Sequence, residues 1–355
     1  MDIQKRETFE FFPILVGDIE GGERDSGDFP MVIRIIAELV ALWHVLRSTD
    51  YKNVSHIILH GPLLYRLSAY SAHWIYKKDL SYFVRFGRGV GDYLEEIWSI
   101  YDDFLCHDPK PRQWIDAWRK GEKIRAIYLI GALLKDIRQK AQEQRKTVLG
   151  IVEKATATEV IRQLFDAMLR DQEGKELLKP FIGEEVPSQI AAQVDTIIRR
   201  SRYNDPLLLS VLLNEGEYIY PIEAKERYSG FVGEVEGFGE YLQKSIPIKY
   251  TYLKVFPESI PFRIEHFVEI EGPQATGLYA KLYSYARLLP SYAFPLGLDI
   301  VDKFVRIPKW MVKAYERYIL LSMKGSGHNT TEEEIRSLLR FYILNDRVFQ
   351  KRPNP

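Results

Sequence analysis

The chain has 355 residues, of which 46% are hydrophobic and 13% aromatic, so it can bury a full core and is not a disordered tail. Its 49 basic residues balance its 49 acidic residues, which excludes a uniformly basic nucleic-acid coat and requires any polyanion site to be local. The single cysteine, Cys106, excludes an internal disulfide and a thiolate zinc site, and it favours a reducing cytoplasm. A charged start and apolar runs shorter than the ~20 residues of a bilayer span predict that the protein is neither secreted nor membrane-spanning.

The first half of the chain predicts helices around two short strands. Apolar residues recur at spacings of three and four from Phe29 to Leu46, which is typical of a helix. The run His56–Leu59 predicts a buried strand that ends at His60-Gly61-Pro62, because proline cannot continue the ladder and glycine permits a tight turn. Residues 91–140 look mainly helical, and Thr147–Val152 predicts a second strand.

The second half predicts strands followed by helices. Apolar and alternating segments between residues 205 and 267 predict a meander of antiparallel strands. Helices are expected at Gln274–Leu289 and Asp299–Val305. We expect a single domain over residues 1–324, with a weak internal boundary near 184–188, and a C-terminal helical tail over residues 325–355.

Common catalytic signatures are absent from the sequence, including GxxxxGK[ST], GxGxxG after a strand, HExxH and GxSxG. ATPases, zinc peptidases and α/β-hydrolases of those types are therefore disfavoured. What remains is a set of acidic residues and one histidine at the ends of predicted strands or on helices beside them. Metal-dependent nucleases assemble their sites in this way, and two oxygen ligands with one nitrogen ligand suit Mn²⁺ or Mg²⁺.

Six segments follow one another in an informative order: RIIAE, HIILHGPLL, VLGIVEKATAT, NDPLLLSVLLNEGE, PFRIEHF and SYAFPLGLDIVDKFVRIP. This order resembles the NurA family of DNA-end-processing nucleases, from about residue 29 to residue 312. The resemblance implies an α/β fold with an RNase H-like mixed sheet core, surrounding helices and an additional antiparallel meander. It also implies Mn²⁺ rather than Mg²⁺ as cofactor, a homodimer around DNA, docking onto a HerA-type hexameric ATPase, and a role in double-strand-break resection.

The resemblance carries four candidate site residues to this chain. Glu38 matches the acidic metal ligand on a helix, and His60 stands where the family commonly has Asp in an Asp-Gly context. Tyr292 and Asp302 match a tyrosine and an acidic or histidine position beside a Pro-Leu segment. The family's Asp-Gly-Ser triplet is missing, and Asp18 is a poor substitute. We therefore expect either a chain that starts downstream of that motif or a divergent member with a weakened or lost site.

Each candidate also has an ordinary explanation. Glu38 can pair with Arg34 across one helical turn, and His60 can be a turn histidine. Tyr292 can be a packed loop aromatic, and Asp302 an acid on a helix surface. Further cations can either guide the DNA backbone or be solvated, namely Lys154, Lys135, Arg138 and Lys140.

A rival constellation consists of Asp205, Glu223 and Lys225. It imitates the acid, then acid-x-lysine, arrangement of restriction-endonuclease-like sites, in which carboxylates bind metal and lysine polarises water. Two functional hypotheses remain for the resemblance itself. The first is an active metal-dependent nuclease, and the second is a binding subunit that has lost catalysis and serves as an adaptor or DNA clamp. Since the matched positions supply few carboxylates, we expect weak nuclease activity or none, with retained partner docking.

Overall fold

The structure is a computed structural model that describes residues 29–66, 68, 74–76, 99–100, 123–174, 176, 204–231, 237–289 and 292–305. The chain divides into two compact units. The first contains residues 34–298, together with residues 1–15, and the second contains residues 16–33 and 299–355. The expected boundary at 184–188, the expected tail at 325–355 and Asp18 lie outside the described residues.

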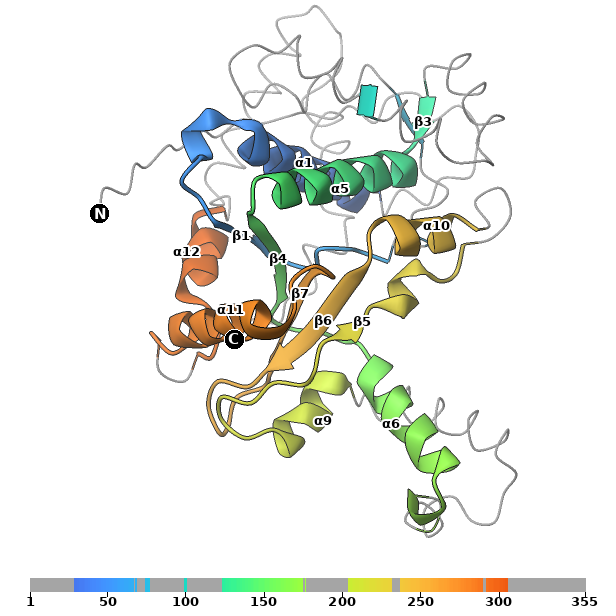
Figure 1. Ribbon diagram of the computed structural model, residues 1–355, viewed down its shortest axis with the longest axis vertical. Helices are drawn as coiled ribbons and strands as arrows, with labels where there is room; N and C mark the ends of the chain where they lie inside the picture. Colours follow the sequence, from blue (N-terminus) through green and yellow to red (C-terminus); the bar gives the residue numbers. More distant parts are fainter. Residues whose placement is uncertain are drawn as a thin grey trace, which may run out of the picture. The chain divides into compact units, whose positions relative to one another are not determined.

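Five strands of the first unit form one mixed sheet in the order β1-β4-β7-β6-β5 (Figure 1). Their bounds are His56–His60 for β1, Thr147–Val152 for β4, Phe262–Phe267 for β7, Ile248–Leu253 for β6 and Ile222–Glu223 for β5. β1 and β4 are parallel, and the remaining neighbours pair antiparallel. The carboxyl ends of β1 and β4 therefore lie at one edge of the sheet.

The predicted α/β class and the positions of both early strands are confirmed, but β1 is not buried as expected: it is the edge strand of the sheet and is half-buried. The antiparallel meander is part of the same sheet. Strands β5, β6 and β7 extend the sheet that β1 and β4 begin, because β7 pairs directly with β4 from Leu149↔His266 to Val152↔Arg263. The sheet is thus continuous from the first strand to the last. A separate small ladder, β2 (Trp74–Tyr76) with β3 (Lys123–Arg125), was not predicted.

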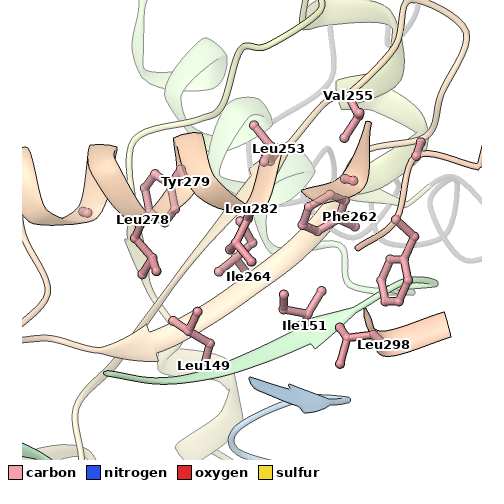
Figure 2. Close-up of a cluster of buried hydrophobic side chains, with 14 of the residues drawn as sticks. Leu149, Ile151, Leu253, Val255, Phe262, Ile264, Leu278, Tyr279, Leu282 and Leu298 are labelled. Carbon is pink, nitrogen blue, oxygen red and sulfur yellow. The ribbon is translucent and has the colours of Figure 1, made fainter. Parts of the chain in front are cut away.

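One face of the sheet carries a hydrophobic core beneath α11, which spans Gly272–Ala286. Figure 2 shows Ile151 of β4 and Ile264 of β7 in one cluster with Leu278 and Leu282 of α11. Side chains alternate between the two faces of a strand. Because Ile264 faces α11, its neighbours on β7 face the other side.

The opposite face is covered by α1 (Phe29–Arg47), α5 (Ala126–Glu143) and α10 (Phe238–Ser245). The ring of Trp43 on α1 donates a hydrogen bond of 2.8 Å from Nε1 to Asp136 on α5, and the two helices lie side by side in Figure 1. Leu59 of β1 lines a small hollow together with residues of α1 and α5. Leu59 pairs in register with Gly150 of β4, and Gly150 pairs with Glu265 of β7. Glu265 therefore lies on the same face of the sheet as Leu59.

The remaining described elements are α6 (Glu159–Arg170), α9 (Asp205–Leu212), α12 (Leu296–Val305) and two 3-10 turns, η1 (Thr49–Tyr51) and η3 (Lys225–Tyr228). The segment 205–212 is a helix, so the prediction that it belongs to the meander was wrong. Asn204 caps it by accepting a hydrogen bond from the Leu207 N–H at 3.0 Å, and Pro206 fits the first turn, where no backbone N–H is needed. Among the described residues, no helix is long and apolar enough to cross a membrane.

Candidate functional site

The chain leaves β1 at His60 and runs directly over β4. We call residues 61–65 the β1 loop. Gly61 adopts φ = +138°, which favours glycine, and its N–H donates to the Ile151 carbonyl at 2.8 Å. A Cβ on Gly150 would stand 2.3 Å from the Leu63 backbone nitrogen. The β1 loop thus lies in backbone contact with β4, which fixes how the chain turns away from His60.

Glu38 lies on α1, above the β1 loop. Its Oε1 is 3.4 Å from Arg34 Nε, and its Oε2 accepts a hydrogen bond of 3.4 Å from the hydroxyl of Tyr65, the last residue of the loop. Arg34 also donates to that hydroxyl at 3.3 Å. Glu38 lines a small hollow together with Leu59 and other apolar residues. Its side chain is 39% exposed, so it is open to solvent while being oriented by two neighbours.

Burial raises the pKa of the Glu38 carboxyl above its ordinary value. The guanidinium of Arg34, the hydroxyl of Tyr65 and the imidazole of His60 each act in the opposite direction and hold the pKa of Glu38 down. Burial outweighs them. A carboxyl with a raised pKa that is open to solvent can bind a cation or exchange a proton.

His60 and Tyr292 lie on the other side of the same strand end. His60 is exposed, and its ring centroid lies 5.5 Å from that of Phe294, a member of the core beneath α11. Phe294 is in turn 6.3 Å from the ring of Tyr292, which is 41% exposed. Ala293 between them has φ = +56°, a left-handed conformation that reverses the chain direction. Glu38 and the His60–Tyr292 pair thus flank the carboxyl end of β1 from opposite faces.

The predicted DNA-binding cations occupy two different regions. Lys154 is exposed two residues after β4 ends, at the same sheet edge as His60, because β1 and β4 are parallel. Arg138 instead donates to the Ser245 carbonyl at 2.6 Å and forms an ion pair with Glu269, beyond the carboxyl end of antiparallel β7. Lys140 on the same helix lies 3.9 Å from Asp136, and Lys135 is half-buried. The structure therefore brings Lys154 to the edge that carries His60 and places Arg138 toward the opposite edge.

The rival residues have local contacts. Asp205 is fully buried and accepts hydrogen bonds from the Val160 and Ile161 N–H groups at 3.1 and 3.0 Å, at the start of α6. Burial raises the pKa of Asp205, although these two bonds oppose the rise. Glu223 lies 3.7 Å from Lys225, and both side chains are exposed. The contacts of the rival set are therefore a helix cap and a surface ion pair.

The residues that could hold a metal ion form an incomplete set within the described ranges. Glu38 offers a carboxylate and His60 an imidazole, a donor pair that suits Mn²⁺ better than Mg²⁺. No group of three or more His, Cys, Asp or Glu side chains that could hold an ion is found in the described part of the chain. Asp18 lies outside that part, and of Asp302 only the backbone, within α12 of the second unit, is described.

Sequence reasoning missed two groups at this edge. The first is Tyr65, which donates a hydrogen bond to Glu38. The second is the pair Arg263 and Glu265 on β7, and both side chains are 0% exposed. The signal for the pair was present in the segment PFRIEHF, where two charged residues alternate with apolar ones in a strand. Neither their burial nor their partners can be read from that pattern.

Comparisons with known proteins complete the description of the site. A family model described as the NurA domain matches residues 50–307, a range that contains His60, Lys154, Tyr292 and Asp302 and begins after Glu38. A search of curated proteins found no significant match. Among solved structures, the NurA nuclease from Sulfolobus solfataricus is similar at 12% sequence identity and a TM-score of 0.46, over 88% of this chain and 73% of that one.

Proposed function

The chain belongs to the NurA family, and we propose that it is a Mn²⁺-dependent nuclease that hydrolyses phosphodiester bonds at DNA ends. The observation that carries the proposal is the placement of Glu38, His60, Tyr292 and Lys154 around the carboxyl ends of two parallel strands. Two of these side chains are potential metal ligands, one is a cation, and one is an exposed phenol. Metal ligands can place an activated water beside a phosphate diester, and a cation and a hydroxyl can bind its oxygens.

Each side chain has a distinct role in the proposal. Glu38 would contribute a carboxylate to the metal, which would supply an activated water and offset the negative charge on the scissile phosphate. His60 approaches the strand end from the opposite face and would donate a hydrogen bond to a phosphate oxygen or bind an ion on its own side. Arg34 and Tyr65 orient the Glu38 carboxylate. Lys154 neutralises a phosphate of the bound strand, and the Tyr292 hydroxyl donates a hydrogen bond to a phosphate oxygen.

Finer family properties are part of the same proposal. They comprise an RNase H-like description of the core, a homodimer that encloses DNA, docking onto a HerA-type hexameric ATPase, and work in double-strand-break resection. The family match supports all of them alike. Light scattering at micromolar concentration tests the dimer: a mass of twice 41.5 kDa is expected, and a monomer would contradict it.

A second candidate function is an adaptor or DNA clamp that has lost catalysis. Three observations favour it. The described residues hold no three-donor metal group, and Glu38 is already engaged by Arg34 and Tyr65. The sequence also lacks an Asp-Gly-Ser triplet.

A cleavage assay separates the two candidates. Single-stranded and blunt duplex DNA are incubated with the protein in Mn²⁺ or Mg²⁺, with and without a HerA-type ATPase. A nuclease degrades DNA in Mn²⁺ and more slowly in Mg²⁺. An adaptor leaves DNA intact under every condition but binds the ATPase. A protein that neither cleaves DNA nor binds the ATPase contradicts both.

A further inference from the structure

A buried chain of charges lies behind the candidate site. Arg263 and Glu265 of β7 are both 0% exposed, and Arg263 Nε lies 2.8 Å from Glu265 Oε1. On its other side, Arg263 Nη1 lies 3.0 Å from Oε2 of Glu159, the first residue of α6, which is 6% exposed. Arg227 Nη2 approaches Glu265 Oε1 at 3.7 Å. Two cations thus face two carboxylates.

Glu265 holds the β1 loop. While its Oε1 faces Arg263, its Oε2 accepts hydrogen bonds from the backbone N–H groups of Leu63 at 2.9 Å and Leu64 at 3.4 Å. These two peptide groups lie between His60, where the strand ends, and Tyr65, which donates to Glu38. The loop that connects two site residues is therefore tied to β7 by one carboxylate.

Arg263 holds the segment after β4, residues 153–158, which we call the β4 loop. Arg263 stands opposite Val152, the last residue of β4, and its guanidinium reaches Glu159, where the loop ends. Its guanidinium carbon lies 3.8 Å from the centroid of the Tyr250 ring, which fixes the side chain from below. The β4 loop carries Lys154 and is thus anchored at both ends.

Stability alone gives no reason for this arrangement. Burying three charges is costly, and apolar residues of similar volume fill such a space at least as well. Hydrogen bonds to ionised groups are directional, so they fix the position of the groups that they hold. Two contacts of the network reach the loops that leave the parallel strands at the site: Glu265 accepts from the Leu63 N–H, and Arg263 donates to Glu159.

We infer that Glu265 and Arg263 are positioning residues, which set the placement of the β1 loop relative to the β4 loop and thereby of His60 relative to Lys154. The catalytic part of this inference rests on the proposed nuclease function, whereas the anchoring of the loops does not. Neither residue touches the DNA; each acts through the backbone or the carboxylate that it binds.

Amide hydrogen exchange tests the anchoring directly. In the wild-type protein the Leu63 and Leu64 amides should be protected although they lie in a loop, because both donate to a buried carboxylate. In Glu265→Ala they should exchange about 10 to 100 times faster, the factor expected for loss of a hydrogen bond to a charged acceptor. Wild-type amides that exchange as fast as those of an unstructured peptide would overturn the inference, even if the variant fails to fold.

Lys254→Met is the matched control. Lys254 is also a buried charge, 5% exposed, and its Nζ donates to two backbone carbonyls, those of Ser210 and Leu213. It holds the end of α9 instead of a site loop. This variant should lose stability without faster exchange at Leu63 and Leu64. If the Leu63 and Leu64 amides exchanged equally faster in both variants, loss of any buried charge would loosen the β1 loop, and this would contradict the inference.

Cleavage kinetics test the consequence for the site. In Glu265→Ala, kcat should fall about 100-fold, as for a displacement of roughly 1 Å, while KM changes little. Glu265→Gln keeps an oxygen for the loop amides and should recover part of kcat. Unchanged kcat in a folded Glu265→Ala would refute the positioning role. A wild-type protein without any cleavage would refute the nuclease proposal, and the exchange experiment would still decide the anchoring.

Discussion

The substitution Arg263→Met probes the buried charges most severely. Methionine keeps an unbranched stem over the Tyr250 ring but removes the guanidinium that lies 2.8 Å from Glu265 and 3.0 Å from Glu159. Two carboxylates are then left inside the protein without their main counter-charge, and Arg227 at 3.7 Å is the remaining cation beside Glu265. The variant should therefore lose much of its stability.

The size of the expected stability loss in Arg263→Met follows from the full burial of Arg263. Breaking a buried ion pair by removing one partner costs about 3–5 kcal/mol. A loss of 1 kcal/mol lowers Tm by roughly 2–4 °C in proteins of about 150–250 residues. We therefore expect Tm of Arg263→Met to fall by about 6–20 °C, toward the smaller value because this chain is longer.

Arg287→Met provides the matched control. Arg287 Nη2 also pairs with a glutamate, Glu215, at 3.4 Å, and its guanidinium also lies near a tyrosine ring, that of Tyr283 at 5.3 Å. Its side chain is 49% exposed, so the pair is worth less than about 1 kcal/mol. Both variants are compared by calorimetry and by urea unfolding. Equal losses in the two variants would refute the argument that burial makes the Arg263 contacts strong.

A double-mutant cycle isolates the coupling. Glu265→Gln alone leaves Arg263 without its nearest anion, and the double variant Arg263→Met with Glu265→Gln removes both charges. The double variant should be more stable than the sum of the single losses by at least about 1 kcal/mol, because the residues are in direct contact. Additive losses would show that the pair does not interact as its geometry indicates.

Two further predictions concern Glu38, which lies above the β1 loop, and Gly150 of β4, which lies in contact with that loop. Burial raises the pKa of Glu38 in the folded protein above its value in the unfolded chain. The contribution of Glu38 to stability is therefore complete below the unfolded pKa and is lost as the pH rises through the folded pKa. Between these two pKa values, the wild type should lose stability relative to Glu38→Gln. NMR titration should place the pKa above the ordinary value, and Tyr65→Phe should raise it further; a depressed value would contradict this. Gly150→Ala should destabilise by about 1–3 kcal/mol or more, because the new methyl group meets the Leu63 nitrogen at 2.3 Å. Gly277→Ala on α11, where nothing lies within 4 Å, should instead stabilise by about 0.5–1 kcal/mol in the same denaturation assay. Similar effects of the two alanines would refute the clash.

The sequence was informative where periodicity is strong. The helix predicted at Phe29–Leu46 is α1, and the strands at His56–Leu59 and Thr147–Val152 are β1 and β4 within one residue. The end of the strand at His60-Gly61-Pro62 was predicted from glycine and proline chemistry and is confirmed, and Gly61 there adopts a positive φ. Local rules suffice for such features because their causes are local.

Features that depend on distant partners were not predictable. The helix at Asp205–Leu212 reads as an apolar run, and only its cap at Asn204 distinguishes it from a strand. The burial of Arg263 and Glu265 depends on α6 and on the β1 loop. Leu63 of that loop, which donates to Glu265, is 202 positions away from it in the chain. Of the candidate site, the residue types at the strand ends could be predicted, whereas the approach of Glu38 and His60 from opposite faces required the fold.

A comparison of Glu38→Gln with Glu223→Gln tests the central claim most directly. Both glutamates are exposed by more than a third and pair with a neighbouring cation, Arg34 at 3.4 Å and Lys225 at 3.7 Å, so each change should cost less than about 1 kcal/mol of stability. Their consequences for Mn²⁺-dependent DNA cleavage should nevertheless differ. If Glu38 belongs to the site, Glu38→Gln lowers kcat/KM by at least about 100-fold, as for the loss of several kcal/mol of metal-assisted stabilisation, and Glu223→Gln has little effect. Cleavage that survives Glu38→Gln but disappears in Glu223→Gln, with Tm unchanged, would contradict the account and move the site to the rival residues.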